Sequence, residues 1–207
     1  NTIEDINTRY NVTEKDTVLN IAQLNFDLSV YDIFGLLSVG GTVVVPSVDK
    51  YTNPAHWKQL VTKYNVSIWN SVPSFMQMFV VLKDEINENE LDSLRLVMMS
   101  GDWIPVSLPN KIMSIAKNAK VVSLGGATEA SIWSIYHEYE DEDKEKISIP
   151  YGKPLYNQGY KVLDEKLNDC PVYVTGELYI TGKGLAEGYY NNQELTKKSF
   201  FIHDITG

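Results

Sequence analysis

The segment Gly125-Gly126-Ala127-Thr128-Glu129 places two glycines, a hydroxyl and a carboxylate next to one another. Glycine lets a backbone approach a ligand closely, and the Thr128 hydroxyl can donate a hydrogen bond to a phosphate oxygen. The Glu129 carboxylate suits magnesium, which commonly binds one or two carboxylates together with substrate phosphates. Because the sequence contains no Walker-type lysine loop, such a nucleotide site would belong to another class. The other interpretation is a plain turn in which Thr128 caps a helix.

A second candidate for chemistry is Asp27, which precedes a segment with helical spacing. One interpretation is a carboxylate that caps the N-terminus of that helix. Leu28 and Tyr31 lie three positions apart and therefore share one helix face. In the other interpretation, Asp27 and this face line one pocket together.

The elements that must position these residues alternate between residues 18 and 126. Short apolar runs occupy residues 18–24, 42–45, 66–70, 94–99 and 120–124, and segments with helical spacing occupy about 29–38, 54–64, 74–84 and 106–118. Runs without in-and-out alternation are typical of strands buried on both faces, as in a parallel sheet covered by helices. The pattern predicts an α/β fold with a doubly wound, mostly parallel sheet.

Open parallel sheets bind ligands at the carboxyl ends of their strands, where loops and helix N-termini converge. Four of the five predicted strands end in polar or small residues, whereas the second ends in the plain turn Pro46-Ser47. We therefore expect one cleft at this edge of the sheet, lined by Asp27, Asn70, Ser100, Gly101, Leu124, Thr128 and Glu129.

The character of the sequence changes after Pro150. Residues 159–164 and 177–181 alternate apolar and polar positions, which predicts the start of a small antiparallel β subdomain. We assign residues 1–150 to an α/β parallel-sheet subdomain with an acidic loop at 138–146, and residues 151–207 to a partial β-rich subdomain. The loop is interpreted as solvated, with an acidic docking site as the alternative. The abrupt start at Asn1 and end at Gly207 predict a fragment truncated at both ends.

Composition excludes several other classes of function. The net charge of −9 over 207 residues argues against a nucleic-acid binder, because such proteins carry clustered lysine and arginine. No apolar run approaches the length of a membrane span, so no membrane partner is expected. Cys170 is the one cysteine, which excludes an intrachain disulfide and favours a reducing compartment, the cytoplasm.

Three motifs resemble those of the adenylate-forming enzymes, and within them the adenylation domains of nonribosomal peptide synthetases. Residues 26–34 (FDLSVYDIF) resemble the amino-acid-binding motif, and residues 176–200 resemble a downstream motif. Residues 125–129 resemble the adenine- and magnesium-binding motif, although Gly125 and Ala127 replace its usual Tyr and Pro. Ser123 stands where many members place an Asn, and Gly101 matches the glycine that lies flat against adenine. The motifs occur in the family's order and cover most of the chain.

The resemblance implies that ATP and an amino acid give an aminoacyl-adenylate and pyrophosphate. The acyl group then passes to the pantetheine thiol of a peptidyl carrier domain, with a condensation or heterocyclisation domain in the same assembly line. The resemblance implies ATP and Mg²⁺ as cofactors, Thr128 and Glu129 as catalytic residues and Glu129 as the metal ligand. The family's phosphate loop, ribose-binding Asp and catalytic Lys have no match, so the fragment alone is expected to be inactive. The nucleotide-binding residues implied are Gly101, Gly125, Gly126, Ala127 and Thr128.

The family's substrate pocket carries over to Asp27, Leu28, Tyr31, Asn70, Met98, Ser100, Leu124, Ile132 and Trp133. Asp27 would bind the α-ammonium group of an amino acid. The other eight residues are uncharged, so a charged side chain would enter unpaired at considerable cost. The set resembles that of cysteine-activating domains, with Met98 in place of the near-isosteric Leu. We expect L-cysteine, with serine as its competitor, because a thiol and a hydroxyl differ by only ~1–3 kcal/mol in one pocket.

Two alternatives are open. An acyl- or aryl-CoA ligase of the same superfamily would share the fold, but its substrates have no α-ammonium group for Asp27 to bind. A non-catalytic flavodoxin-like binding module would explain the parallel sheet, but it would leave the motif at 176–200 unexplained.

Overall fold

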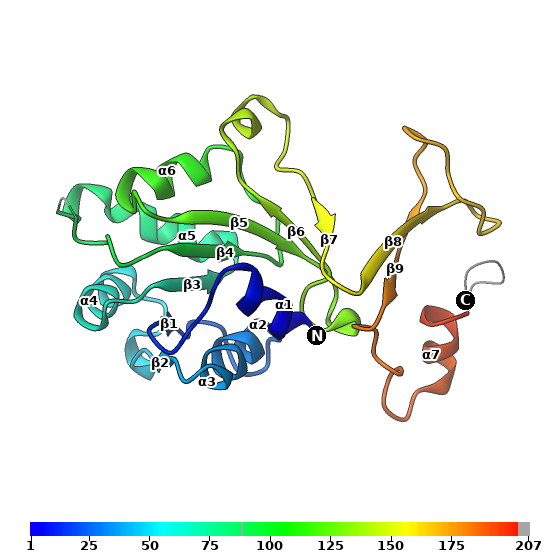
Figure 1. Ribbon diagram of the computed structural model, residues 1–207, viewed down its shortest axis with the longest axis horizontal. Helices are drawn as coiled ribbons and strands as arrows, with labels where there is room; N and C mark the ends of the chain where they lie inside the picture. Colours follow the sequence, from blue (N-terminus) through cyan, green and yellow to red (C-terminus); the bar gives the residue numbers. More distant parts are fainter. Residues whose placement is uncertain (88, 203–207) are drawn as a thin grey trace.

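A mixed sheet of seven strands forms the centre of the computed structural model, which describes residues 1–87 and 89–202 (Figure 1). The strand order is β2-β1-β3-β4-β5-β6-β7. The first five strands in this order run parallel, and they are β2 (Thr42–Val44), β1 (Thr17–Leu19), β3 (Ile68–Ser71), β4 (Leu96–Met99) and β5 (Lys120–Gly125). β6 (Ile135–Glu138) and β7 (Lys153–Pro154) extend the sheet in antiparallel orientation. The predicted doubly wound, mostly parallel sheet is confirmed.

The sequence predicts neither β6 nor β7, and it places the end of β1 too far along the chain. β6 has one buried and three half-buried residues, so it lacks the unbroken apolar run that marks the parallel strands. β1 ends at Leu19, whereas the apolar run continues to Leu24. The backbone turns there, because the Ile21 N–H donates to the Leu19 carbonyl at 3.1 Å, and Leu24 is exposed.

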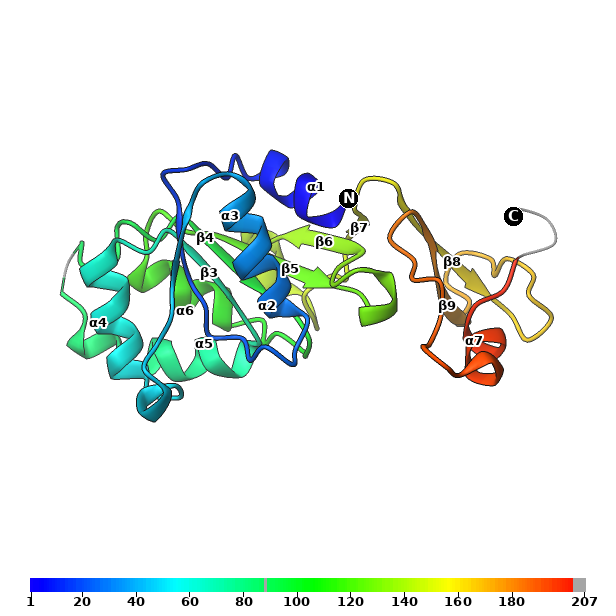
Figure 2. The same ribbon diagram turned by 90° about the horizontal axis from the view of Figure 1, so that it is seen from below.

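Helices cover both faces of the sheet (Figure 2). Alternate residues of the parallel strands point to opposite faces: Trp69 and Met99 belong to one core cluster, and Ile68 and Met98 to the other. The first cluster lies under α4 (Pro54–Tyr64), α5 (Pro73–Val80) and α6 (Leu108–Ile115). The second lies under α1 (Thr2–Arg9), α2 (Leu28–Val30) and α3 (Leu36–Ser38), with a π-helical turn at Tyr31–Gly35 between α2 and α3.

Local sequence signals explain where α4 begins and ends. The Asn53 side chain accepts hydrogen bonds from the N–H groups of Ala55 and His56, and Pro54 is the first helical residue. Asn65 ends the helix in the left-handed conformation, with φ of 49°. Shorter 3-10 turns occupy Val48–Lys50, Val81–Glu85, Thr128–Ala130 and Asp141–Glu145. Within the described part of the chain, every helix is too short or too polar to cross a bilayer.

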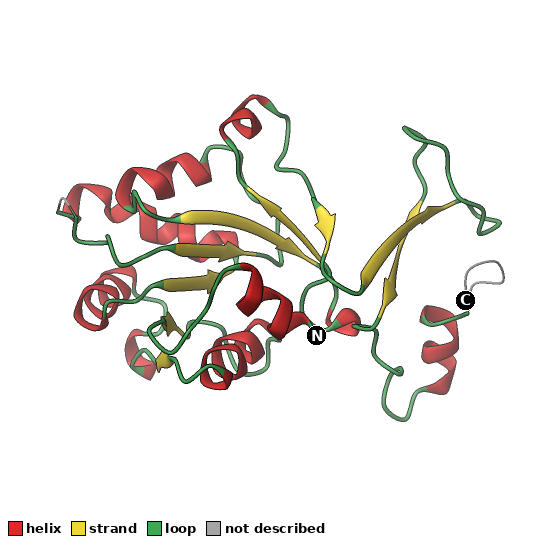
Figure 3. Ribbon diagram, viewed as in Figure 1, coloured by secondary structure: helices red, strands yellow, loops and turns green. Residues whose placement is uncertain are grey.

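A separate two-stranded sheet follows the large one (Figure 3). β8 (Gln158–Leu163) pairs antiparallel with β9 (Glu177–Gly182), as the alternating pattern predicts. The sequence analysis does not predict α7 (Gln193–Ser199), which begins where the Asn192 side chain accepts from the Leu195 N–H at 3.1 Å. This region touches the larger one through the Ala186 N–H, which donates to the Glu129 carbonyl at 2.7 Å.

The acidic loop has a buried centre. Asp143 is fully buried, and its carboxylate accepts from Lys146 Nζ at 2.6 Å, from His137 Nε2 at 2.7 Å and from the Glu140 N–H at 2.9 Å. Burial alone would raise the pKa of Asp143, but the hydrogen bonds from Lys146, Glu140 and His137 outweigh it and lower the pKa to about 2. Asp143 therefore organises the loop that joins β6 to β7.

We expect Asp143→Asn to lower the free energy of unfolding by about 2–3 kcal/mol at neutral pH. The folded-state pKa lies below the unfolded value of about 3.9, so this stabilisation is complete above about pH 4 and is lost as the pH falls towards 2. Urea unfolding of both proteins at pH 7, 4 and 2.5 measures the effect, and the difference between their stabilities should shrink to less than half at the lowest pH. The exposed Asp141→Asn is the matched control and should change stability little. Equal losses for both variants would contradict the prediction.

Candidate functional site

Asp27 and Thr128 meet at the carboxyl edge of the sheet, although 101 positions separate them in the sequence. Thr128 Oγ1 donates a hydrogen bond to Asp27 Oδ2 at 2.6 Å. Asp27 stands at the N-cap of α2, but its side chain makes no capping hydrogen bond, so the interpretation as a helix cap is wrong. No ion pair among the described residues involves Asp27. Asp27 is half-buried, and its carboxylate has no cationic partner among the described residues.

The other side chains predicted to form the substrate pocket are linked to one another by contacts at the second core cluster. The Tyr31 and Trp133 rings lie 5.2 Å apart at 53°, and Trp133 Nε1 donates to Ser100 Oγ at 3.0 Å. Asn70 on β3 pairs in register with Met98 on β4, so both side chains lie on the same face of the sheet. One hydrophobic cluster contains Leu28, Tyr31, Met98, Leu124 and Trp133, with Ile132 packed against it. All nine residues are thus brought together.

Tyr31 is fixed from two sides. Its hydroxyl donates to Asn7 Oδ1 at 3.0 Å, and the Asn7 amide donates to the Gly35 carbonyl at 2.8 Å. A Cβ at Gly35 would lie 2.9 Å from the Tyr31 ring, so only glycine lets the π-helical turn close against that ring. No sequence pattern marks Asn7, because only the tertiary structure brings α1 next to the turn.

Asp32 is a further polar residue of this region, and it is fully buried. Its Oδ2 accepts from Asn20 Nδ2 at 3.0 Å and its Oδ1 from Asn70 Nδ2 at 2.8 Å. Burial raises the pKa of Asp32 to about 7, although the two amide hydrogen bonds oppose this by favouring the ionised form. Asp32 lies within the motif at residues 26–34, but that motif alone predicts no role for it. Its position between Tyr31 and Ile33, on a buried helical segment, is the signal that could have identified it.

A cleft of about 510 Å³ lies beside the end of β5. Three of the five predicted nucleotide-binding residues, Gly101, Gly125 and Gly126, line it together with Ser123. Ala127 and Thr128 do not line it, because the chain turns there and the Thr128 hydroxyl is directed to Asp27. At Gly101 the backbone has a φ of +82°, a conformation that glycine adopts readily and other residues rarely adopt. The remaining lining residues are Asp102, Trp103, Ile104, Leu124, Ser148, Ile149, Pro150 and Tyr151.

Tyr151 is a lining residue that the sequence analysis does not identify. A Cβ at Gly125 would lie 2.3 Å from Tyr151 Cε2, so the tyrosine ring occupies the space beside this glycine. Tyr151 is half exposed in the cleft. The next residue, Gly152, has a φ of +107° and lies against the Tyr136 carbonyl, where a Cβ would not fit. A side chain at position 125 would therefore collide with the Tyr151 ring.

Glu129 is the carboxylate predicted to bind magnesium. The Tyr189 hydroxyl donates to its Oε1 at 2.5 Å and lowers the pKa of Glu129. The described residues contain no group of three or more metal-ligating side chains. Glu129 does not line the cleft beside β5, and a single carboxylate of this kind would fit a magnesium ion whose other ligands are phosphate oxygens and waters rather than an all-protein metal site.

The loop between Glu129 and Trp133 contains two consecutive residues in the left-handed region, Ser131 at φ 62° and Ile132 at φ 71°. This conformation costs a β-branched residue on the order of 1–3 kcal/mol. Ser131 Oγ donates to the Gly184 carbonyl at 2.6 Å, which ties the loop to the smaller region. The contact with Gly184 therefore helps to hold the loop in this conformation.

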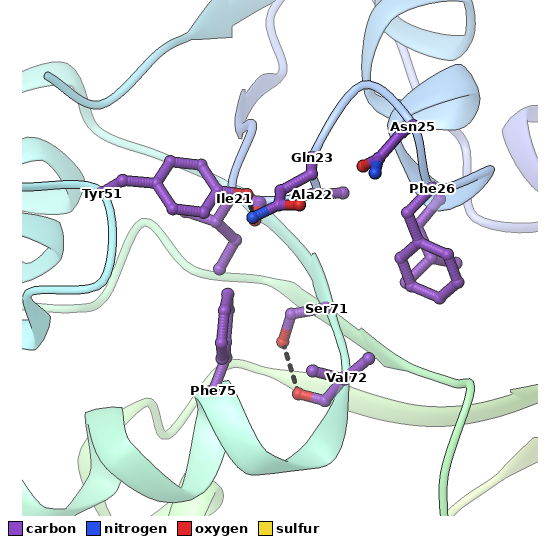
Figure 4. Close-up of a pocket in the computed structure, with 10 residues that line it drawn as sticks. Ile21, Ala22, Gln23, Asn25, Phe26, Tyr51, Ser71, Val72 and Phe75 are labelled. Carbon is purple, nitrogen blue, oxygen red and sulfur yellow. Dashed lines mark hydrogen bonds between the residues drawn. The ribbon is translucent and has the colours of Figure 1, made fainter. Parts of the chain in front are cut away.

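A second hollow lies where β1 and β3 end (Figure 4). Its volume is about 350 Å³, and Phe26, Tyr51 and Phe75 contribute aromatic walls. The Tyr51 hydroxyl donates to the Ile21 carbonyl, and Ser71 Oγ donates to the Val72 carbonyl at 2.9 Å. Leu28 is the one residue that this hollow shares with the predicted substrate pocket, so most of its lining lies outside the predicted site.

Comparison with known proteins gives a consistent result. The family described as AMP-binding enzyme matches residues 1–190. The chain is 50% identical over 208 residues to bacitracin synthase 1 of Bacillus licheniformis, covering 100% of this chain and 4% of the relative. It is 43% identical over 203 residues to pyochelin synthetase PchF of Pseudomonas aeruginosa, covering 98% of this chain and 11% of the relative. The chain thus spans a small part of the curated relatives that it matches.

Solved structures are similar along the whole chain. The nonribosomal peptide synthetase FmoA3 superposes with a TM-score of 0.95 at 40% identity, covering 100% of this chain and 22% of that protein. FmoA3 has also been solved with AMPPNP bound and with α-methyl-L-serine-AMP bound.

Proposed function

Because the chain belongs to the AMP-binding enzyme family, as part of an adenylation domain of the nonribosomal peptide synthetase type, we propose that the complete domain activates a small α-amino acid, L-cysteine in preference to others. The observation that carries this proposal is the Asp27 carboxylate, which lies beside the pocket without a cationic partner among the described residues. An α-ammonium group would take the place that the Thr128 hydroxyl now occupies on Asp27.

The walls of the pocket support a short side chain. Tyr31, Met98 and Trp133 are at most 1% exposed and belong to one cluster, so we expect them to leave room for only a short substrate side chain. Asn70 and Ser100 add polar atoms to these walls, which favours a side chain with one polar atom. In FmoA3, at 40% identity, the bound adenylate is that of α-methyl-L-serine, another amino acid with a polar atom on Cβ.

The reaction proposed is attack by the substrate carboxylate on the α-phosphorus of ATP. A C(=O)O–P bond forms, the bond to the β,γ-phosphates breaks, and pyrophosphate leaves with that electron pair. The residues of this chain would orient the substrate through Asp27 and receive the nucleotide in the cleft beside Gly101, Gly125 and Gly126. A magnesium ion held by Glu129 would supply positive charge for the phosphates.

The later steps extend the proposal to partners. We infer that the acyl group passes from its adenylate to the pantetheine thiol of a carrier domain, beside a condensation or heterocyclisation domain, in the cytoplasm. The assembly-line relatives support this inference by their similarity to the chain. An acyl- or aryl-CoA ligase would use the same fold, but Asp27 would then face a substrate without an α-ammonium group.

The test is amino-acid-dependent ATP–pyrophosphate exchange by the complete adenylation domain, with the standard amino acids as a panel. We expect L-cysteine to give the highest kcat/KM, ahead of serine, threonine and alanine, because the pocket is short and carries polar atoms. 3-Mercaptopropionate has the cysteine side chain without the ammonium group, and it should support no exchange. Preference for a large aliphatic or aromatic amino acid would contradict the pocket assignment. Exchange with 3-mercaptopropionate would favour the CoA-ligase alternative.

A further inference from the structure

Asp32 is the centre of a buried polar network that the proposed chemistry does not use. Asp32, Asn20 and Asn70 are 0%, 6% and 0% exposed, and they come from three different segments of the chain. Each oxygen of Asp32 accepts one amide N–H, from Asn20 at 3.0 Å and from Asn70 at 2.8 Å. Burying a carboxylate is costly, so the network needs a benefit that an apolar residue at position 32 would not supply.

The network fixes which end of the Asn70 amide faces which way. The Leu28 carbonyl, at 3.3 Å, can only accept, and Oδ1 of ionised Asp32, at 2.8 Å, also accepts, so Nδ2 of Asn70 must face them. This turns Oδ1 of Asn70 away from the helical segment. Oδ1 is buried and accepts no hydrogen bond from the described residues. A buried acceptor without a donor is destabilising, and such an atom in a binding region points to a ligand that supplies the donor.

Asn70 lies among the residues of the predicted substrate pocket. It is in register with Met98, and its amide reaches the Leu28 carbonyl on the helical turn that follows Asp27. We propose that Asp32 is a positioning residue that holds the Asn70 amide so that its Oδ1 is a fixed acceptor for a thiol or hydroxyl hydrogen on the substrate side chain. The inference rests on the proposed function and deepens it, because it identifies what selects a donor-bearing side chain.

The consequence is discrimination against amino acids of the same shape without a donor. 2-Aminobutyrate has a methyl group where cysteine has its thiol, and it would leave Oδ1 of Asn70 unpaired. A site built to bond a donor rejects such analogues far more strongly than an apolar pocket does, and a thiol is a weaker donor than a hydroxyl. The complete domain should therefore prefer cysteine to 2-aminobutyrate by at least ~100-fold in kcat/KM.

The experiment measures the ratio of kcat/KM for cysteine to kcat/KM for 2-aminobutyrate in four forms of the complete domain: the unmutated domain, two single variants and one double variant. In Asp32→Asn one of the two neighbouring amides loses its acceptor, Asn70 is free to turn its NH₂ group towards the substrate, and the ratio should fall below ~10. Asn20→Ala is the matched control: it removes one hydrogen bond of the same network without releasing Asn70, so the ratio should stay within about threefold of the unmutated value. The double exchange Asp32→Asn with Asn70→Asp restores a donor–acceptor pair and an acceptor oxygen at position 70, so it should recover most of the ratio.

Several results would overturn the proposal. A ratio in Asp32→Asn equal to that of the unmutated domain, at an unchanged melting temperature, would show that Asp32 is only structural. Equal losses in Asp32→Asn and Asn20→Ala would show the same. If Asp32→Asn does not fold, the double exchange decides: a folded protein without the preference contradicts the proposal, and one that retains it supports the proposal.

A second measurement separates this inference from the proposed function. Hydrogen exchange of the Asn70 side-chain amide, followed by NMR in the ¹⁵N-labelled chain, should be slow in the unmutated protein and in Asn20→Ala, and faster in Asp32→Asn. Unaltered protection in Asp32→Asn would overturn the positioning role whatever the enzyme activates. An unmutated domain that exchanges with no amino acid would instead contradict the proposed function.

Discussion

Replacing Asp27 with alanine in the complete adenylation domain should lower kcat/KM for the amino acid by roughly 100- to 5,000-fold, or ~3–5 kcal/mol. The bound substrate would bury its α-ammonium group beside a position that no longer carries a counter-charge. Thr128 Oγ1 would lose its acceptor but could bond water, because Thr128 is exposed, so the fold should tolerate the change. Amino-acid-dependent ATP–pyrophosphate exchange measures the loss, and the melting temperature reports whether folding is affected.

Two variants control this prediction. Asp27→Asn keeps an acceptor oxygen for Thr128 but removes the charge, so it should lose nearly as much activity as the alanine variant. Asp49→Asn removes the charge of an exposed carboxylate that lines neither hollow and should change kcat/KM for the amino acid little. If Asp27→Asn retains exchange within tenfold of the unmutated domain, the carboxylate is not the partner of the ammonium group.

The parallel half of the fold could be predicted because its strands are buried on both faces. Every residue of β4, Leu96–Met99, is buried, so the apolar run is unbroken and its ends are visible in the sequence. β6 carries the polar residues His137 and Glu138 at the border of the sheet, and α7 has no buried residue. Their hydrophobic signals are correspondingly weak, and pattern analysis does not separate them from loops.

The general position of the site could be predicted from strand exits, but its internal contacts could not. Asp27 and Thr128 each follow a strand of the same parallel sheet, which is enough to expect them at one edge. The bond from Asn70 to Asp32 joins residues 38 positions apart, and the bond from Tyr189 to Glu129 spans 60 positions. No local pattern encodes such pairs, because they depend on how the turn at Tyr31–Gly35 and the smaller region dock on the sheet.

Glu129 combines three features that suit a magnesium ligand. It follows β5, its side chain is only half-buried, and the Tyr189 hydroxyl, which donates to its carboxylate, lowers its pKa. Its backbone carbonyl also accepts from the Ala186 N–H at 2.7 Å, which anchors the residue independently of its side chain. A change confined to the side chain should therefore affect the charge and leave the loop in place.

Replacing Glu129 with glutamine should lower kcat for exchange by roughly 100- to 1,000-fold, because the site loses the negative charge that would hold the cation against the phosphates. The amide can still accept from Tyr189, so the melting temperature should change little. The same measurement across a magnesium series should show that the variant needs much more Mg²⁺ to reach half of its own maximum. The matched control is Glu187→Gln, because Glu187 is exposed and follows Ala186, which contacts Glu129. This variant should behave like the unmutated domain. An unaltered magnesium dependence in Glu129→Gln would assign the metal to other residues of the complete domain.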